Sequence, residues 1–400
     1  MAEDRDRMER ITAALDAANL DGLICTLPEN VLLLSGYWPV VGTSVAVATR
    51  SGRHAVLAPE DEEALARHGW APDVRTYQPG ALHALITPPE AVREPLAQLL
   101  GNLDVATGRL GFEDMSIYEP STYAAMYLFQ ANIQDVLKAA APSATLIADA
   151  TPIVHLRSAL TPREVGRVRL GCEIAGSAFV SAARGIRAGQ REPEVAAAFA
   201  VPMQIEGLAQ DGVERAGAYT WCMSGPNSAD AGAAFARTQN RELRSGDLVL
   251  VHCNSYIDGY WTDITRTYCL GEPDERQQAM YGAISAARDA ALRAIRPGAR
   301  AANVDRAARD ILTERGFGQY FTHGIGHNVG FSAISADFPP RLHPASPDVL
   351  TVGMTFNIEP SIYIKSYGGI RHCDVVTVHE DGPEVLTPFQ IGMDQLVIGG

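Results

Sequence analysis

Hydrophobic positions in the first part of the chain alternate between helical and strand spacing. Met8, Ile11, Leu15 and Ala18 recur every three to four residues, which predicts one apolar face of a helix. The mostly apolar run that follows, over 21–26, predicts a strand. Helical and strand patterns continue to alternate beyond it, so the sequence predicts an α/β domain here.

Turn residues in the same part of the chain predict a β-hairpin. Two apolar segments, 45–49 and 54–58, flank Ser51-Gly52-Arg53, a combination typical of a tight turn between paired strands. Further on, residues 115–146 carry a helical pattern. This part of the sequence contains no cluster of reactive side chains, so we interpret it as a scaffold or dimerisation domain.

A helix start near residue 160 predicts the boundary of a second domain. Thr161 is a suitable N-cap, Pro162 suits the first helical position, and Glu164 stands three residues after the cap. Because a capping box of this kind marks where a helix begins, we predict two domains, 1–158 and 159–400.

The second domain contains an internal repeat. Residues 186–195 share an Ile-Arg-x-Gly-x-Arg-x-x-x-Val pattern with residues 295–304, 109 positions later. The pattern Leu-x-x-Gly at 243–246 recurs at 350–353, 107 positions later, and each copy leads into an apolar strand. Two matches in the same order predict a duplicated α-α-β unit whose halves bury one shared sheet.

Polar residues interrupt the second domain where apolar strands are expected. The segments concerned are 249–253, 261–267, 323–327, 356–360 and 369–374. A carboxylate or imidazole inside an apolar strand is costly unless it is paired or bound to a metal. At the offset of 107 positions His252 corresponds to Glu359, and we expect both to end strands that face each other across one pocket.

Composition and charge exclude several classes of partner. The 400 residues carry a formal net charge of −14, so the chain lacks the basic surface that nucleic acids and anionic membranes attract. No apolar run reaches the ~18 residues of a membrane span, and the charged first residues do not resemble a signal peptide. The six cysteines show no disulfide or C-x-x-C spacing, so we expect buried, reduced thiols in a cytoplasmic protein.

These motifs resemble those of the pita-bread fold family, which includes aminopeptidase P, prolidase, methionine aminopeptidase and the metal-free creatinase. The segments that carry the resemblance are 28–37, 246–250, 259–267, 323–327, 358–360 and 368–371. The resemblance covers nearly the whole chain and includes the family's duplicated catalytic domain. It implies an α/β (α+β) fold with a creatinase-like N-terminal domain, 1–158, and a pita-bread catalytic domain, 159–400.

The resemblance also implies a metal site in which two ligand positions have changed. The family's dinuclear site uses Asp, Asp, His, Glu and Glu, and three of these match Asp263, His327 and Glu359. The first Asp is replaced by His252, eleven positions before the second, and the last Glu is replaced by Cys373. Both replacements are residues that can bind a metal.

The changed ligands favour one divalent ion over two. Asp263, Glu359 and a Cys373 thiolate supply at most three negative charges, where the family has four carboxylates. Nitrogen and sulfur donors favour zinc, with manganese as the alternative. A metal-free site, as in creatinase, is also compatible with these replacements.

Further positions of the substrate site depart from the family's peptidases. The catalytic His seven residues after the metal His is replaced by Ile334, and Phe235 stands near the place of another. His323 is kept, and His343, on a predicted loop, is a candidate substitute. We expect these four residues to bind substrate, with Arg371 helping to orient it.

The leading hypothesis is metal-dependent hydrolysis of an amide (C–N) bond in a small peptide-like substrate, with Xaa-Pro peptides as the family's default. Glu359 would act as the general base, and His323 and Arg371 would orient the substrate. One alternative is a creatinase-like, metal-free C–N hydrolase of a small nitrogenous metabolite, with His252 or His327 as the base. Another is a non-catalytic binding relative. We expect a homodimer.

Overall fold

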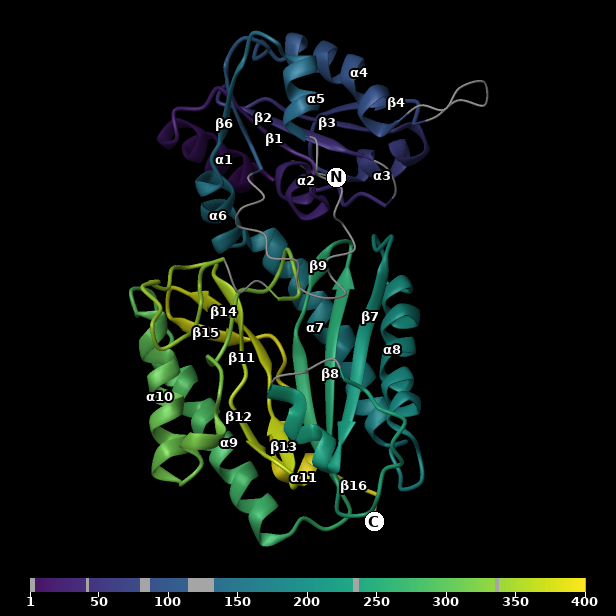
Figure 1. Ribbon diagram of the computed structural model, residues 1–400, viewed down its shortest axis with the longest axis vertical. Coiled ribbons are helices and arrows are strands. Elements are labelled where there is room, and N and C mark those ends of the chain that lie inside the picture. Colours follow the sequence, from purple (N-terminus) through teal and green to yellow (C-terminus); the bar gives the residue numbers. More distant parts are fainter. Residues whose placement is uncertain are drawn as a thin grey trace. The chain divides into compact units, whose positions relative to one another are not determined.

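The structure is a computed structural model that describes residues 4–40, 43–79, 87–113, 133–232, 237–334 and 338–399. The chain divides into two compact units, Met1–Arg157 and Ser158–Gly400 (Figure 1). Both units combine helices with sheets, so the mixed α and β architecture is confirmed.

The N-terminal unit is built on a six-stranded mixed sheet of order β4-β3-β2-β1-β5-β6. Its strands are β1 (Gly22–Cys25), β2 (Val45–Thr49), β3 (His54–Pro59), β4 (Asp73–Tyr77), β5 (Arg109–Phe112) and β6 (Thr145–Ala148). Its helices are α1 (Arg5–Ala17), α2 (Pro28–Ser35), the 3-10 helix η1 (Glu60–Glu62), α3 (Glu63–His68), α4 (Pro88–Asn102), α5 (Ile133–Ala140) and α6 (Thr151–Ser158).

The local predictions for this unit are confirmed with one exception. Helix α1 buries Ile11 and Leu15 completely, and β2 pairs with β3 as an antiparallel hairpin. The helical prediction for 115–146 is wrong at its end, because β6 pairs in parallel with β5 and thereby completes the sheet. Residues 115–132 of that prediction lie outside the described part of the chain.

The C-terminal unit contains three separate hydrogen-bonded sheets among its described residues, of order β16-β10-β8-β7 with β9 beside β8, β11-β14-β15 and β12-β13. The strands are β7 (Ala216–Ser224), β8 (Leu248–Ile257), β9 (Tyr260–Trp261), β10 (Ile264–Leu270), β11 (Thr355–Ile358), β12 (Ser361–Ile364), β13 (Gly368–Arg371), β14 (Asp374–His379), β15 (Gly382–Val385) and β16 (Val397–Ile398).

Helices flank these strands. They are α7 (Pro162–Ala183), α8 (Glu192–Leu208), the 3-10 helices η4 (Gly225–Gly232) and η5 (Gly318–Tyr320), α9 (Glu275–Ala294), α10 (Ala301–Glu314) and α11 (Met393–Leu396). Figure 1 shows α8 on one side of the strands and the pair α9 and α10 on the other. Helix α7 begins with the predicted capping box, since Glu164 N donates to Thr161 Oγ1 (3.3 Å) and Thr161 N donates to Glu164 Oε2 (2.7 Å).

The internal repeat is visible in equivalent backbone contacts. Gly189 N donates to Leu243 O at 2.9 Å, and Gly298 N donates to Leu350 O at 2.8 Å. The two glycines also share a positive φ, of 85° and 82°. The duplicated α-α-β unit is therefore confirmed.

The prediction of one shared sheet is wrong for the described residues. Strands β7, β8 and β10 of the first half and strands β11 to β15 of the second half lie in separate sheets, although β16 joins β10. An isolated bridge between Thr265 and Cys373 links the two halves. The bridge stays isolated because Cys373 lies between β13 and β14, where the chain passes from one sheet to another. Polar side chains gather at this junction, which positions the candidate site.

Two whole-chain expectations concern membranes and thiols. Across the described ranges, no helix is long and apolar enough to cross a membrane. All six cysteines are free and buried, as their spacing predicted.

Candidate functional site

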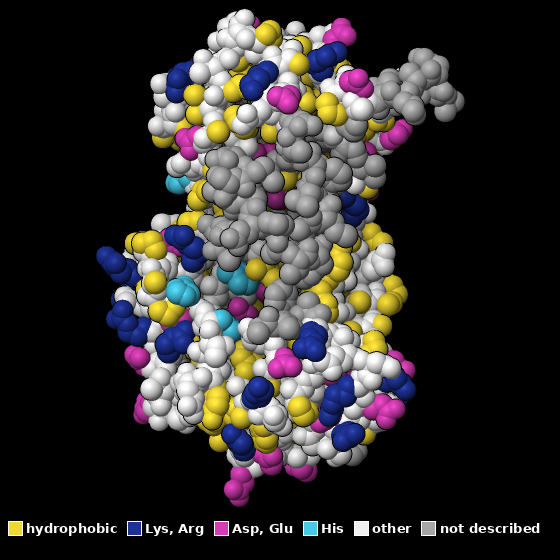
Figure 2. All heavy atoms as spheres, in the orientation of Figure 1, with side chains coloured by type: hydrophobic (Ala, Val, Ile, Leu, Met, Phe, Trp, Pro, Cys, Tyr) yellow, Lys and Arg dark blue, Asp and Glu magenta, His cyan; other side chains and the backbone are white. Residues whose placement is uncertain are grey.

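A cavity of about 440 Å³ in the C-terminal unit brings most of the predicted site residues together. Its lining includes His252, Asp263, His323, His327, Ile334, His343, Glu359 and Arg371. Cys373 is fully buried and is not among the lining residues. Phe235 lies outside the described residues. Figure 2 shows histidine side chains beside acidic side chains on one face of this unit.

The repeat-related residues His252 and Glu359 occupy different places on their strands. Glu359 directly follows β11, as predicted. The prediction that His252 ends a strand is wrong, because β8 continues to Ile257. The strand continues because it is paired on both sides at this point, with Trp221 of β7 and Thr265 of β10 opposite His252.

The segment 323–327 is not the strand that we expected but a tightly held loop. Glu359 N donates to Ile325 O at 2.7 Å, which ties the loop to the end of β11. A Cβ atom at Gly326 would lie 1.9 Å from Asn357 O, so only glycine allows this approach. The close approach places His327 beside β11.

Asp263 lies at the centre of the five predicted ligands. Its Oδ1 is 3.4 Å from His252 Nδ1, and its Oδ2 is 3.3 Å from His327 Nε2. The Cys373 thiol donates to the backbone oxygen of Asp263 at 3.1 Å. His327 Nε2 is also 3.9 Å from Glu359 Oε1. The structure therefore brings these five side chains into one cluster.

Burial and nearby charge act differently on the two histidines. Burial lowers the pKa of His252 to about 3, although the charge of Asp263 opposes this shift. Burial also disfavours the charged form of His327, but its hydrogen bond with Asp263 and the charge of Glu359 outweigh burial and raise its pKa. At neutral pH, His252 is therefore a neutral imidazole.

Burial and nearby charge also shift the pKa values of Asp263 and Cys373 in opposite directions. Burial raises the pKa of Asp263, but the charges of His252, His327 and Arg371 outweigh burial and lower it overall. Burial raises the pKa of Cys373 well above its usual value, and the charge of Asp263 adds to this effect. Without a metal, Cys373 is a neutral thiol beside an ionised Asp263.

The hydrogen bonds of His327 determine which of its ring nitrogens can bind a metal ion. Nδ1 lies 3.1 Å from Asn328 O, and a carbonyl oxygen can only accept, so Nδ1 carries a proton. Nε2 faces Asp263 and Glu359: it donates to Asp263 when the ring is protonated, and it has a free lone pair when the ring is neutral. This tautomer suits metal ligation through Nε2.

Asn357, on β11, is a site residue that the sequence reasoning missed. Its Nδ2 is 3.3 Å from Asp263 Oδ2, 3.1 Å from His327 Nε2 and 3.4 Å from Cys373 Sγ. The available signal was a polar residue between two apolar neighbours, Phe356 and Ile358, on the strand that precedes Glu359.

The donor atoms fit one divalent ion by chemistry. Asp263 Oδ2 and His327 Nε2 are 3.3 Å apart, close to the ~3.4 Å between two ligands of a tetrahedral zinc ion with bonds of about 2.0–2.1 Å. Two carboxylates and an imidazole are suitable ligands. Among the described residues, however, no three His, Cys, Asp or Glu side chains are already arranged to hold an ion.

Arg371 and His323 complete the polar lining of the cavity. Arg371 Nε donates to Thr265 Oγ1 at 3.1 Å and lies 3.8 Å from Glu359 Oε2. His323 Nδ1 donates to the Gly324 oxygen at 2.7 Å, and its Nε2 is 2.9 Å from Ser361 Oγ. Both side chains are thus held in fixed orientations toward the cavity.

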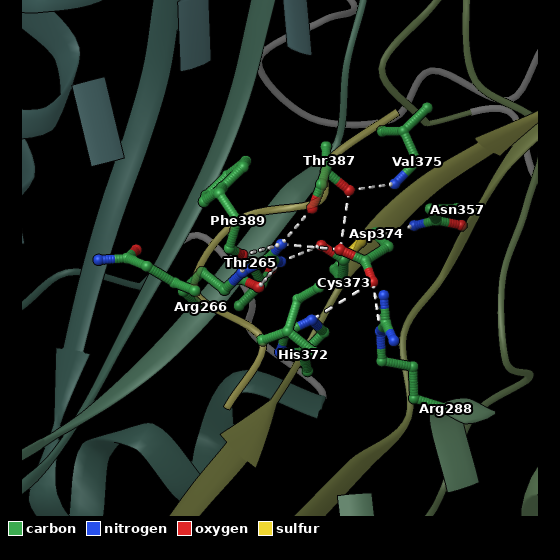
Figure 3. A network of polar contacts seen from close by, with 12 residues as sticks. Thr265, Arg266, Arg288, Asn357, His372, Cys373, Asp374, Val375, Thr387 and Phe389 are labelled. Atoms are coloured by element: carbon green, nitrogen blue, oxygen red, sulfur yellow. Dashed lines mark hydrogen bonds and ion pairs between the residues drawn. The ribbon is translucent and has the colours of Figure 1, made fainter. Parts of the chain in front are cut away.

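A buried ionic network supports the backbone beside the cluster (Figure 3). Asp374 accepts hydrogen bonds from Arg266 Nη2 (2.7 Å), Arg288 Nε (2.5 Å) and Thr387 Oγ1 (2.7 Å). Arg266 Nη1 also donates to Cys373 O at 2.7 Å. Burial raises the pKa of Asp374, but Arg266 and its other partners hold it well below the usual range. The network anchors the backbone position of Cys373.

Known proteins resemble this chain over nearly its whole length. Residues 7–155 match the creatinase/prolidase N-terminal domain, and residues 166–380 match metallopeptidase family M24. The Xaa-Pro dipeptidase of Pyrococcus furiosus is 30% identical over 384 residues, which are 96% of this chain and 98% of that protein.

Solved structures show the same fold. An Xaa-Pro dipeptidase from Bacillus anthracis superposes with a TM-score of 0.78 at 25% identity, over 98% of this chain and 99% of that one. The prolidase from Pyrococcus furiosus gives a TM-score of 0.72 at 27% identity, over 95% and 99% of the two chains. Its sequence and its fold together place this protein in metallopeptidase family M24.

Proposed function

We propose that this protein is a metal-dependent hydrolase that cleaves the amide bond of a small peptide-like substrate, with Xaa-Pro dipeptides as the first class to test. The observation that carries the proposal is the contact of Asp263 with both His252 and His327, beside a cavity that Glu359 and Arg371 also line. The Xaa-Pro dipeptidases among the relatives support this substrate class.

The ion would be held by some of the five predicted ligands. They are His252, Asp263, His327, Glu359 and Cys373. When bound, a divalent ion lowers the pKa of a water ligand and polarises a carbonyl group. Nitrogen and sulfur donors support zinc as the ion, with manganese as the alternative, and the small number of carboxylates supports a single ion.

Glu359 is the proposed general base. It is 8% exposed and lines the cavity, so its carboxylate is available to a water molecule and a substrate that bind there. Arg371, 3.8 Å from Glu359, supplies a fixed positive charge that orients the carbonyl or carboxylate of the substrate. His323, His343 and Ile334 would contact the rest of the substrate, together with Phe235.

The test is hydrolysis of Xaa-Pro dipeptides by the purified protein after metal removal and reloading with Zn²⁺ or Mn²⁺. We expect activity that returns with the metal and falls by about 10²-fold or more in Glu359→Gln, because general acid–base catalysis typically contributes that much. No hydrolysis with either ion would overturn the proposal.

A metal-free C–N hydrolase is the second candidate, and the Asn357 amide among the predicted ligands favours it. In that case His252 or His327 would be the base, and full activity would survive chelation. We further propose a homodimer in the cytoplasm, a location that the buried reduced thiols support.

A further inference from the structure

The carboxamide of Asn357 has one orientation. His327 N donates to Asn357 Oδ1 at 2.7 Å, and Asn357 N donates to His327 O at 3.1 Å. A backbone N–H can only donate, so the side-chain atom facing it is the oxygen. The amide nitrogen of this fully buried side chain must therefore point toward the cluster.

The amide nitrogen meets three atoms that would otherwise be ligands of an ion. They are Asp263 Oδ2 at 3.3 Å, His327 Nε2 at 3.1 Å and Cys373 Sγ at 3.4 Å. Because it has no available lone pair and carries two hydrogens, an amide nitrogen does not bind a cation. An ion and this amide therefore compete for the same acceptor atoms.

Hydrogen bonds also fix the position of the Cys373 thiol. It accepts from Asn357 Nδ2 and donates to the backbone oxygen of Asp263 at 3.1 Å, and it is fully buried. The amide nitrogen lies within 3.4 Å of Sγ, of Asp263 Oδ2 and of His327 Nε2, so it occupies the side of the sulfur atom that an ion shared with those two ligands would need. The contacts of Asn357 thus oppose ligation by Cys373.

We propose that Asn357 is an internal competitor of the metal, which weakens ion binding at the site and keeps Cys373 out of the ligand shell. This inference rests on the proposed metal-dependent function. The metal affinity of this chain would then depend on Asn357 as well as on the ligand residues.

The test compares Zn²⁺ and Mn²⁺ binding to the metal-free wild type and to Asn357→Ser, by calorimetry and by metal analysis after dialysis. We expect the variant to bind Zn²⁺ about ten-fold more tightly, since at least one competing hydrogen bond is lost. Asn328→Ser is the matched control, because this buried neighbour uses its side chain to contact Pro339 O instead. Circular dichroism checks that each variant is folded.

The outcomes separate this inference from the proposed function. Equal or weaker binding by folded Asn357→Ser would overturn the role of Asn357 and leave metal-dependent hydrolysis intact. If the wild type binds no ion and Asn357→Ser does, the result would support competition by Asn357 and overturn the metal-dependent function.

A spectroscopic measurement tests the same idea, and its first part uses only the wild type. Wild-type protein loaded with Co²⁺ should lack a sulfur-to-metal charge-transfer band, because the Asn357 amide occupies the side of Cys373 Sγ that faces the other predicted ligands. Asn357→Ser should gain this band, and Asn357→Ser/Cys373→Ser should lose it again. A thiolate band in the wild type would overturn the proposal.

Discussion

Gly326 and Asn357 are in such close contact that a Cβ atom at position 326 would lie 1.9 Å from the Asn357 carbonyl oxygen. This contact joins the loop that carries His323 and His327 to the strand that precedes Glu359. Site geometry therefore depends on a position that has no side chain.

Replacing Gly326 by alanine should push the loop away from β11. We expect a loss of about 3 kcal/mol or more in unfolding free energy, measured with urea, and a loss of metal binding. The control is Gly166→Ala in α7, where an added Cβ meets no atom within 4 Å. Gly166→Ala should leave the free energy of unfolding unchanged or raise it by about 1 kcal/mol. Equal stability of the two variants would contradict the steric argument.

Restoring the family's carboxylates should change metal content. In His252→Asp/Cys373→Glu, two more carboxylates join Asp263 and Glu359, so the cluster can neutralise a second divalent ion. We expect metal analysis to show more bound Mn²⁺ per chain than in the wild type. His343→Asp, which adds one carboxylate to the lining of the same cavity at a position outside the five predicted ligands, serves as the control. Unchanged metal content in the double variant would show that these two positions do not limit binding.

Removing the carboxylate of Asp374 should destabilise the C-terminal unit. Asp374→Asn leaves Arg266 and Arg288 buried without their shared anion, which typically costs about 3–5 kcal/mol. Urea denaturation of the full chain measures the loss. Asp289→Asn is matched because Asp289 also pairs with Arg288, at 3.4 Å, but is 52% exposed. We expect Asp289→Asn to lower the free energy of unfolding by less than about 1 kcal/mol. Equal losses in the two variants would argue against the network as an anchor.

The N-terminal unit should become less stable in mild acid because of His54. This side chain is 1% exposed, and burial lowers its pKa from 6.5 to about 4. The unfolded chain therefore takes up a proton first. Stability from a neutral His54 is complete above about pH 6.5 and falls as the pH decreases toward 4, by up to about 3 kcal/mol.

The measurement is urea denaturation of the wild type and His54→Phe between pH 7.5 and pH 4.5. We expect the pH dependence to become shallower in the variant, because phenylalanine has no titrating group. His68→Phe is the control, since His68 lies at the exposed end of α3. An equal slope in wild type and His54→Phe would show that other groups carry the acid sensitivity.

Local and repeated patterns were sufficient to predict much of this protein. Helix α1, the β2–β3 hairpin and the capping box of Thr161 and Glu164 depend on neighbouring residues, so their signals lie within short stretches of sequence. The duplicated unit was also visible, because equivalent glycines with positive φ recur at fixed offsets. The motifs likewise indicated which side chains line the cavity, and eight of them do.

Contacts between distant segments decided the rest. Residues 145–148 form a strand because β5 lies beside them, and His252 stays inside β8 because strands on both sides pair with it. The role of Asn357 depends on atoms contributed by Asp263, His327 and Cys373, which come from three other parts of the chain. Sequence patterns show which residue types are present, but only tertiary packing determines which buried donor faces which acceptor.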